Sequence, residues 1–321
     1  MVPAATSVIT QEKYIGKMES ECITGFMPIE ATGDYYSLDE FISYSGLKNL
    51  KKSPAHYRQY KDEPAEVETD AMAFGSAYHC YILEPEKFEK EYYVFDDDAI
   101  YQVLIGEGFK SPRSTKQYKE WMESETRIIG DRKTIEKDLF QKIKDMKEQL
   151  MKHYYCRALL TGGEAEMSIT GVLRTVDGDI KVKAKPDYVK HDKRFIIDLK
   201  TTFDASVDGF TRAAADNDYH IQAAFYSDLL DMISGDGRGW TFFFIAQEKK
   251  KPYAFNIFEA SPQFIGQGKY EYEQLLKLYK MCVEQNRWPG YQVFCEWKSG
   301  NIELNLPKWA IKEIKFYNHY I

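Results

Sequence analysis

Long hydrophobic runs are missing from this chain of 321 residues. Its longest apolar stretch, Trp240 to Ala246 with one threonine inside, is far below the roughly 18 residues that a membrane helix needs. The N-terminus also lacks the basic segment followed by an apolar segment that marks a secretory signal. We therefore expect a cytoplasmic protein that makes no contact with a membrane.

Cysteine is scarce, and no two cysteines form a CxxC pair. The five positions are Cys22, Cys80, Cys156, Cys282 and Cys295. An odd number of widely spaced cysteines argues against a disulfide framework and against a zinc ribbon. Reduced thiols are the simplest interpretation.

An excess of positive charge is also missing, since 43 Lys and Arg stand against 50 Asp and Glu. A net charge of −7 argues against a protein that coats nucleic acid nonspecifically, because such domains are usually basic. The acidity is uneven, however. Residues 1–100 hold 9 basic and 19 acidic side chains, whereas the rest of the chain holds 34 and 31. A site for a charged ligand is therefore expected beyond residue 100.

The hydrophobic pattern changes its period along the chain, and no internal repeat or Gly/Ser linker divides it. Helical spacing predicts helices near 47–53, around His56 and Tyr60, and over 71–83, 116–155, 206–215, 219–233 and 264–285. Alternation predicts strands over 164–175, 179–189, 194–201, 238–246 and 252–259. This order predicts an α/β fold with one central mixed sheet flanked by helices. We expect one domain over 44–321, with an N-terminal extension over 1–43.

The most informative segment joins Asp187 to Asp198 and Lys200. Residues two apart on a strand face the same side, so Asp198 and Lys200 point together. The ten residues between the two aspartates contain a polar turn, and a hairpin of that length places Asp187 beside Asp198. Two converging carboxylates bind a hard divalent cation, which can polarise a phosphoryl oxygen and activate water. Lys200 would orient that water or offset charge on the phosphate.

Other side chains are candidates for the same site. Glu166, in the preceding strand, could add a carboxylate, but Glu164 lies on the same face and the choice between them stays open. His79, on the apolar helix at 71–83, is either a satisfied core histidine or a ligand that uses its neutral imidazole. Gln222 and Tyr226 are four residues apart and share a helix face, from which they could contact substrate.

Basic residues are concentrated around the hairpin. Residues 181–200 hold seven basic side chains against three aspartates. Within this segment Lys181, Lys183 and Lys185 alternate on one strand face, as a phosphate-neutralising stripe would. We assign Lys183 and Lys185 to the binding of a phosphate-bearing substrate, whose affinity should fall steeply with salt; a solvated sheet face is the alternative.

The segment from Asp187 through Asp198 to Lys200 resembles the PD-(D/E)XK nuclease signature, with Asp198 at the (D/E) place. Gly75-x-x-x-His79 and Gln222-x-x-x-Tyr226 resemble flanking motifs of the RecB-like branch. Further stretches, within about 44–312, are similar to phage and prophage RecE-type exonucleases (exodeoxyribonuclease VIII). These stretches are 45–47, 53–57, 74–79, 220–228 and 306–310.

The resemblance implies a PD-(D/E)XK core and a Mg²⁺-dependent exodeoxyribonuclease, with Mn²⁺ able to substitute. Such an enzyme removes one strand of linear duplex DNA from its 5′ end in a bacterial or phage-infected cell. It leaves a 3′ single strand for an annealing protein of the RecT type. A homo-oligomeric ring that threads DNA is also implied.

The resemblance further assigns roles to individual residues. Asp187 and Asp198 become metal ligands, His79 lies near the metal, and Lys200 is the catalytic lysine. Glu166 is favoured over Glu164, because the stretch 165–168 is similar to the strand that precedes the hairpin in that family. Gln222 and Tyr226 form the late motif.

Three alternatives remain beside this interpretation. The first is a nuclease-fold protein that binds DNA or a partner without cutting, although it would have no need of Asp187, Asp198 and Lys200 together. The second is an iron–sulfur relative, which needs a close cysteine cluster near the C-terminus that the sequence lacks. The third is an endonuclease of the same fold, such as a restriction enzyme. Strand polarity cannot be read from the residues themselves.

Overall fold

The computed structural model describes residues 23–28, 35, 38–63, 69–291, 304 and 306. Cys22, Cys295 and the C-terminal stretch at 306–310, apart from Leu306, lie outside this part of the chain. Within the described residues, no helix is both long enough and apolar enough to cross a membrane.

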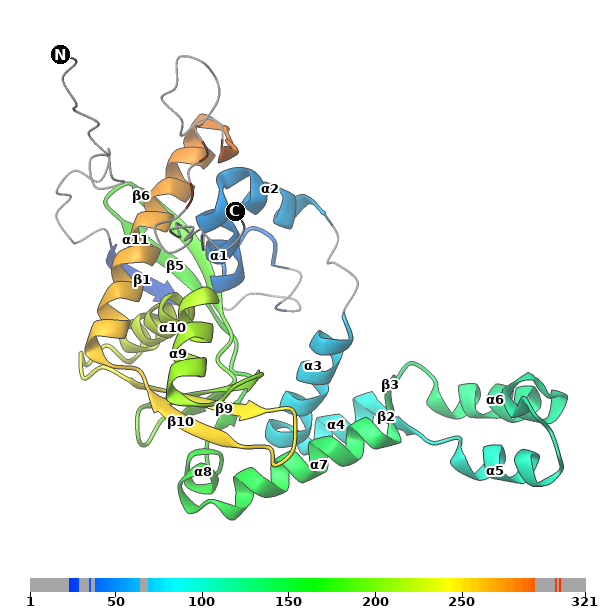
Figure 1. Ribbon diagram of the computed structural model, residues 1–321. Coiled ribbons are helices and arrows are strands. Elements are labelled where there is room, and N and C mark those ends of the chain that lie inside the picture. The colour runs from blue at the N-terminus through cyan, green and yellow to red at the C-terminus, as the bar shows by residue number, and fades with distance from the viewer. Residues whose placement is uncertain are drawn as a thin grey trace, which may run out of the picture.

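A mixed five-stranded sheet forms the centre of the molecule (Figure 1), in the order β10-β9-β8-β7-β4. Its strands are β4 (Glu164–Ala165), β7 (Tyr188–Lys190), β8 (Phe195–Thr202), β9 (Thr241–Glu248) and β10 (Phe255–Glu259). Only the pairing of β8 with β9 is parallel; the other neighbours are antiparallel. The predicted hairpin is the β7–β8 pair, in which Tyr188 lies opposite Ile197.

The expectation of one central sheet needs correction, because a second sheet of three strands lies beside the first. It runs in the order β1 (Ile23–Pro28), β5 (Ile169–Thr175) and β6 (Gly178–Ala184). Each of the two long predicted strands, 164–175 and 179–189, is broken in its middle and contributes to both sheets. The breaks lie at Glu166, whose φ of 52° is left-handed, and at 185–187.

Helices cover both faces of the five-stranded sheet, and strand alternation divides its side chains between two cores. Ile197 and Leu199 of β8 pack with α3 (Asp70–Leu83), α7 (Lys137–Lys152) and α8 (Tyr154–Leu159). Ile196 points the other way, into the core shared with α9 (Val207–Asp216), α10 (Tyr219–Ser234) and α11 (Pro262–Gln285). The period of two therefore places Asp198 on the face of β8 that is turned toward α10.

Two short helices, α1 (Tyr44–Lys52) and α2 (Pro54–Asp62), join this second core. Ser53 ends the first helix and caps the second by accepting a hydrogen bond from the His56 backbone N–H. A proline at the first position of α2 suits a helix start, since its missing N–H needs no partner there. The predicted break at Ser53-Pro54 is confirmed. The segment Ile42–Ser43 just before α1 is tied to β6, because the Lys183 backbone N–H donates to the Ile42 carbonyl.

The predicted helical region 116–155 is more divided than its periodicity suggests. It contains α6 (Lys116–Ile129), then the strand β3 (Lys133–Glu136), and only then α7 and α8. β3 pairs in parallel with β2 (Tyr92–Phe95), which follows α4 (Pro85–Glu91). Figure 1 shows that α5 (Asp98–Gly106), the 3₁₀ turn Pro112–Ser114 and α6 extend from this small ladder as an arm.

Candidate metal and nuclease site

The β7–β8 hairpin brings Asp187 and Asp198 together as the sequence predicts. Asp187 follows β6 and directly precedes β7, and its Oδ2 accepts a hydrogen bond of 2.8 Å from the Leu199 backbone N–H. This bond fixes the carboxyl against the middle of β8. Asp198 is nearly inaccessible, with 1% of its side chain exposed. The hairpin therefore aligns both carboxyl groups with Lys200 in one buried location.

Glu166 resolves the choice that the alternation pattern left open. Its left-handed backbone interrupts the alternation after β4, so Glu164 and Glu166 do not share a face. Glu164 is exposed and lies 3.3 Å from His191 Nε2. The Glu166 backbone N–H instead donates to the Asp187 carbonyl at 2.9 Å, which brings its side chain next to Asp187. Non-glycine residues in this conformation cost roughly 1–3 kcal/mol and are concentrated at functional sites.

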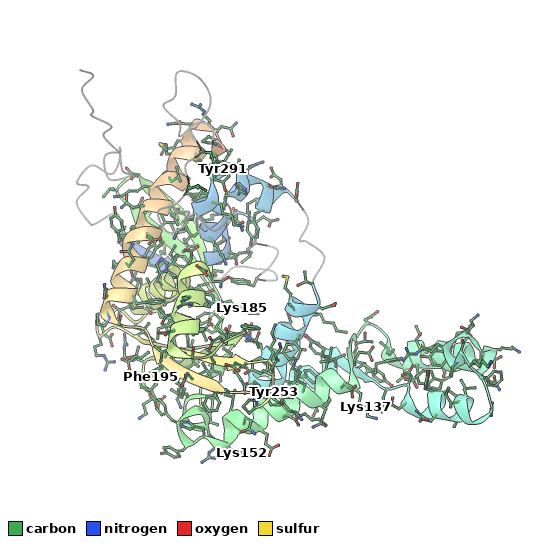
Figure 2. The ribbon with its side chains drawn as sticks, in the orientation of Figure 1. Lys137, Lys152, Lys185, Phe195, Tyr253 and Tyr291 are labelled. Atoms are coloured by element: carbon green, nitrogen blue, oxygen red, sulfur yellow. The ribbon has the colours of Figure 1, made fainter. Side chains whose placement is uncertain are left out.

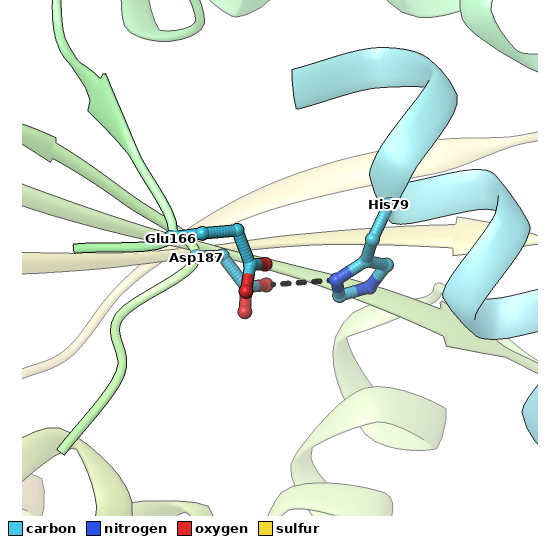
Figure 3. A group of neighbouring side chains, drawn as sticks. All are labelled: His79, Glu166 and Asp187. Carbon is cyan, nitrogen blue, oxygen red and sulfur yellow. Dashed lines mark ion pairs between the residues drawn. The ribbon is translucent and has the colours of Figure 1, made fainter. Parts of the chain in front are cut away.

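His79 completes a group of three potential metal ligands. It extends from α3, and its Nδ1 lies 3.3 Å from Asp187 Oδ2. Figure 3 shows the imidazole of His79 facing the carboxylates of Glu166 and Asp187. One ligand atom from each of these residues lies within 4.8 Å of the others. We call His79, Glu166 and Asp187 the metal cluster. Asp198 borders this group without belonging to it.

The electrostatics of the metal cluster favour a bound cation. Burial raises the pKa of Asp187 to about 7, and the charge of Glu166 adds to that effect while Lys200 opposes it. Burial and the Asp187 carboxylate likewise raise the pKa of Asp198 to about 6. Burial lowers the pKa of His79, which keeps the imidazole neutral and able to act as a ligand. A divalent ion would relieve the cost of ionising these carboxyl groups together.

The donor set also matches such an ion. Carboxylate oxygens are the ligands that Mg²⁺ prefers, and imidazole is compatible with Mn²⁺. The residues present therefore fit a divalent metal. Lys185 Nζ lies 2.7 Å from Glu166 Oε2, so one ligand is balanced by a lysine of this chain.

Lys200 is held from two sides. Its Nζ lies 2.6 Å from Asp198 Oδ1 and 4.6 Å from the centre of the Tyr219 ring. Burial alone would lower the pKa of Lys200, but the Asp198 and Asp187 carboxylates outweigh burial and raise it. The side chain is therefore an ammonium ion at neutral pH, a donor and a positive charge rather than a base.

Helix α10 supplies the late motif. Gln222 donates from Nε2 to Asp198 Oδ2 at 2.7 Å, which fixes the other oxygen of that carboxylate. Tyr226 lies one turn further along the same helix face, where its ring contacts Tyr44 of α1 edge-on with the centroids 6.5 Å apart. Gln222 thus acts on the site through Asp198.

The two lysines assigned to substrate binding both have protein partners, and Lys185 lies beside the metal cluster. Lys183 is buried and donates to the Tyr35 carbonyl at 2.8 Å. Lys185 contacts Glu166, as described above. Both ammonium groups face the ring of Tyr35, at 4.9 and 5.9 Å from its centre. Their role toward substrate stays a prediction.

Sequence reasoning missed the aromatic side chains that surround this site. Tyr219 lies three residues before Gln222, one helical turn away, and that spacing could have identified it. Tyr44 donates from its hydroxyl to the Asn217 carbonyl at 2.5 Å, a contact 173 residues apart that no local pattern reveals. Tyr35 is a third such residue.

Comparison with known proteins now decides the family. Residues 43–300 match the model of a family described as a PDDEXK-like domain of unknown function (DUF3799). The chain belongs to this family. The match includes every residue of the PDDEXK-like site described above except Tyr35.

One solved structure agrees on the fold. A crystal structure from Eubacterium rectale, of a protein whose provisional name is exonuclease, aligns with a TM-score of 0.54 at 16% identity. The alignment covers 87% of this chain and 96% of that one. A second structure, of SSO0001, has a TM-score of 0.27 at 17% identity, covering 52% of this chain and 69% of that one. This TM-score is too low to indicate a common fold. No curated protein sequence matches significantly.

Family and site chemistry together support a nuclease, a hydrolase that acts on nucleic acid. They also support a divalent metal site, since the acidic cluster lies where the PDDEXK-like hairpin converges.

Proposed function

We propose that this PDDEXK-like protein is a metal-dependent exodeoxyribonuclease that removes one strand of linear duplex DNA in the 5′→3′ direction. The observation that carries the proposal is the convergence of Asp187, Asp198 and Lys200 on one hairpin with Glu166 and His79. These side chains come from three separate parts of the chain, the hairpin, the turn after β4 and α3, and they share one largely buried site. A protein that only binds DNA has no need of this combination.

Three residues would hold the metal, which we propose to be Mg²⁺ with Mn²⁺ able to replace it. Glu166 and Asp187 would contribute oxygen ligands and His79 a nitrogen ligand, with Asp198 adjacent. When bound, the ion supplies a Lewis acid for the phosphoryl oxygen and lowers the pKa of a coordinated water.

Lys200 would stabilise the negative charge that develops on the phosphate. Its ammonium donates hydrogen bonds and is already oriented by Asp198, so little reorganisation is needed when the phosphate binds. Gln222 would keep Asp198 in place by its hydrogen bond to Oδ2. The buried surroundings strengthen both interactions, because the effective dielectric constant is low there.

The finer parts of the proposal rest on resemblance. The ordered motifs are similar to RecE-type exonucleases, and the Eubacterium rectale neighbour is provisionally named an exonuclease. On this basis we propose that DNA ends are the substrate and that the 3′ strand passes to a RecT-type annealing protein. A homo-oligomeric ring in a bacterial or phage-infected cell belongs to the same proposal.

Digestion of matched DNA substrates tests the proposal. The purified protein with Mg²⁺ is incubated with linear duplex labelled at either the 5′ or the 3′ end of one strand, and with closed circular duplex. We expect early loss of the 5′ label, progressive shortening and an intact circle. Discrete internal fragments or a cut circle would indicate an endonuclease. Tight binding without hydrolysis under Mg²⁺ and Mn²⁺ would indicate a catalytically silent protein.

A further inference from the structure

A groove of about 600 Å³ lies between α1, α2 and the N-terminal part of α3. Its walls include Lys52 at the end of α1, His56 and Tyr60 on α2, Met72 on α3 and Lys183 on β6. A volume of this size is typical of a ligand-binding cleft. The chemistry of the walls and their position relative to the metal cluster indicate what the groove holds.

One wall of the groove leads directly to the metal cluster along α3. Met72 and His79 are seven residues apart, which is about two turns and about 10 Å along a helix, so they lie on one face. Gly75 lies between them on that face, and a Cβ added there would meet no atom within 4 Å. The helix surface at Gly75, between Met72 of the groove and His79 of the metal cluster, is therefore open.

A second wall leads to the same place along β6 and the segment that follows it. Lys183 lines the groove, and Lys185, two residues later, contacts Glu166 of the metal cluster. Both ammonium groups face the Tyr35 ring, so this ring lies between the two locations. Helix α3 and the β6 segment thus each connect the groove to the metal cluster.

The groove offers the groups that bind a single nucleic acid strand. Lysines attract phosphates, and exposed aromatic rings stack with unpaired bases. Tyr60 is 45% exposed, and Lys52 is exposed at the end of α1. Among the described residues, Lys52 forms no ion pair, whereas its neighbour Lys51 is paired with both Asp218 and Glu271.

We propose that this groove binds a short single-stranded segment of DNA, about one or two nucleotides, on the strand that extends from the metal cluster. Lys52 contacts its backbone, Tyr60 stacks on a base, and Gly75 leaves room for the chain in between. The inference deepens the proposed nuclease function and rests on it. The groove volume of about 600 Å³ leaves no room for a second, paired strand, so the bound strand is unpaired where it lies there.

Binding of a fluorescent dT12 oligonucleotide tests the proposal separately from hydrolysis. All variants are made in a Lys200→Ala background with Mg²⁺ present, so that the probe stays intact. We expect Lys52→Glu to weaken binding about tenfold at low salt and to reduce the slope of log K against log salt by about one. Tyr60→Ala should weaken binding by about fivefold or more.

Lys152→Glu is the matched control, because it makes the same charge change on α7, where Figure 2 shows it far from Lys185. It should alter the dT12 affinity by less than about twofold. Equal losses for Lys52→Glu and Lys152→Glu, or no loss for Lys52→Glu, would overturn the groove assignment.

A second variant tests the path itself. Gly75→Trp fills the open space, and it should weaken dT12 binding while Mg²⁺ binding and the unfolding temperature stay as in the parent. Unchanged dT12 affinity in this variant would contradict a strand path along α3. Because these assays need no cleavage, the groove can be confirmed even where the wild-type protein fails to digest DNA, and it can fail while digestion succeeds.

Discussion

The described residues contain two groups built from the same side-chain types, and only one of them has the properties of a catalytic site. The metal cluster joins His79, Glu166 and Asp187, and a second group joins Asp218, His220 and Glu271. Each has two carboxylates and one imidazole with ligand atoms within 4.8 Å. The difference between them lies in how their charge is balanced.

In the second group, a lysine contacts both carboxylates. We call the group of Asp218, His220 and Glu271 the lysine-bridged cluster. Lys51 Nζ lies 2.6 Å from Asp218 Oδ1 and 2.6 Å from Glu271 Oε2. Burial raises the pKa of Glu271, but hydrogen bonds from Gln267, Lys51 and His220 outweigh it and hold the pKa below its usual value. This group is electrostatically satisfied, and it connects α1 to α10 and α11.

In the metal cluster, by contrast, the charge of Asp187 is not balanced in this way, because burial raises its pKa to about 7. A charged group whose ionisation is made costly by burial is typical of a functional site. The comparison shows that a set of donor types alone does not identify a metal site. The clusters differ in their neighbours: Lys51 contacts both carboxylates of the second group, whereas burial raises the pKa of Asp187 in the metal cluster.

The largest expected effect separates the two groups by activity. Lys200→Ala should lower the rate of DNA hydrolysis by about 10²–10³-fold or more, because the phosphate loses its ammonium partner. Asp218→Asn should leave the rate within about threefold. Initial rates on end-labelled duplex measure both, and circular dichroism verifies folding. Full activity in a folded Lys200→Ala protein would remove the catalytic assignment.

The second effect concerns stability and pH. The pKa of Asp187 in the fold lies above its ordinary value near 4, so the folded chain binds more protons than the unfolded chain between these values. Its contribution to stability is present at low pH and is lost as the pH rises through about 7. Asn cannot ionise, so the Asp187→Asn variant does not lose this stability as the pH rises. Without metal, we expect the variant to be more stable than wild type by about 1–2 kcal/mol at pH 8.

Urea denaturation in EDTA at pH 5 and pH 8 measures this difference. The advantage of Asp187→Asn should grow between the two pH values, and Mg²⁺ in excess of the EDTA should stabilise the wild type but not Asp187→Asn. Glu271→Gln is the control with the opposite sign, because its contribution is lost as the pH falls. An advantage of Asp187→Asn that is the same at both pH values would contradict the raised pKa.

The third effect concerns how Lys200 is positioned. A cation over an aromatic ring gains about 0.5–2 kcal/mol. Tyr219→Leu should therefore reduce kcat by about tenfold with a small change in KM, whereas Tyr219→Phe keeps the ring and should restore most of the rate. Steady-state kinetics of both variants provide the measurement. Equal losses for Phe and Leu would mean that the ring face does not position Lys200.

The smallest effect is expected in the lysine-bridged cluster. Lys51 is 39% exposed, so solvent screens its ion pairs. Lys51→Ala should lower the free energy of unfolding by no more than about 1 kcal/mol and should leave Mg²⁺ binding unchanged. Thermal unfolding with and without Mg²⁺ measures both quantities. A lost Mg²⁺ response would show that the two clusters are coupled.

The parts of the site that the sequence predicted are those governed by one strand period and one turn. Asp187, Asp198 and Lys200 belong to a single hairpin, so their convergence follows from local geometry. The sequence could not decide whether Glu164 or Glu166 faces the metal. The left-handed backbone at Glu166 breaks the strand alternation on which that choice depended. The pairing of Lys185 with Glu166 and the contact of Tyr44 with Asn217 are tertiary and leave no periodic signal.

The fold, too, was predicted where local pattern determines it and missed where tertiary pairing does. Helices α3, α9, α10 and α11 lie within a few residues of their predicted bounds. The second sheet was missed because β5 and β6 are continuous in pattern with β4 and β7 of the first. β3 was missed because Ile135 fits the helical spacing of its neighbours although it pairs with β2.

Isothermal titration of Mg²⁺, repeated with Mn²⁺, against the Asp187→Asn and Asp218→Asn variants tests the central claim most directly. We predict that Asp187→Asn loses the binding heat of the wild type and that Asp218→Asn retains it with the same affinity. Retained binding in Asp187→Asn together with lost binding in Asp218→Asn would place the metal in the lysine-bridged cluster and contradict this account.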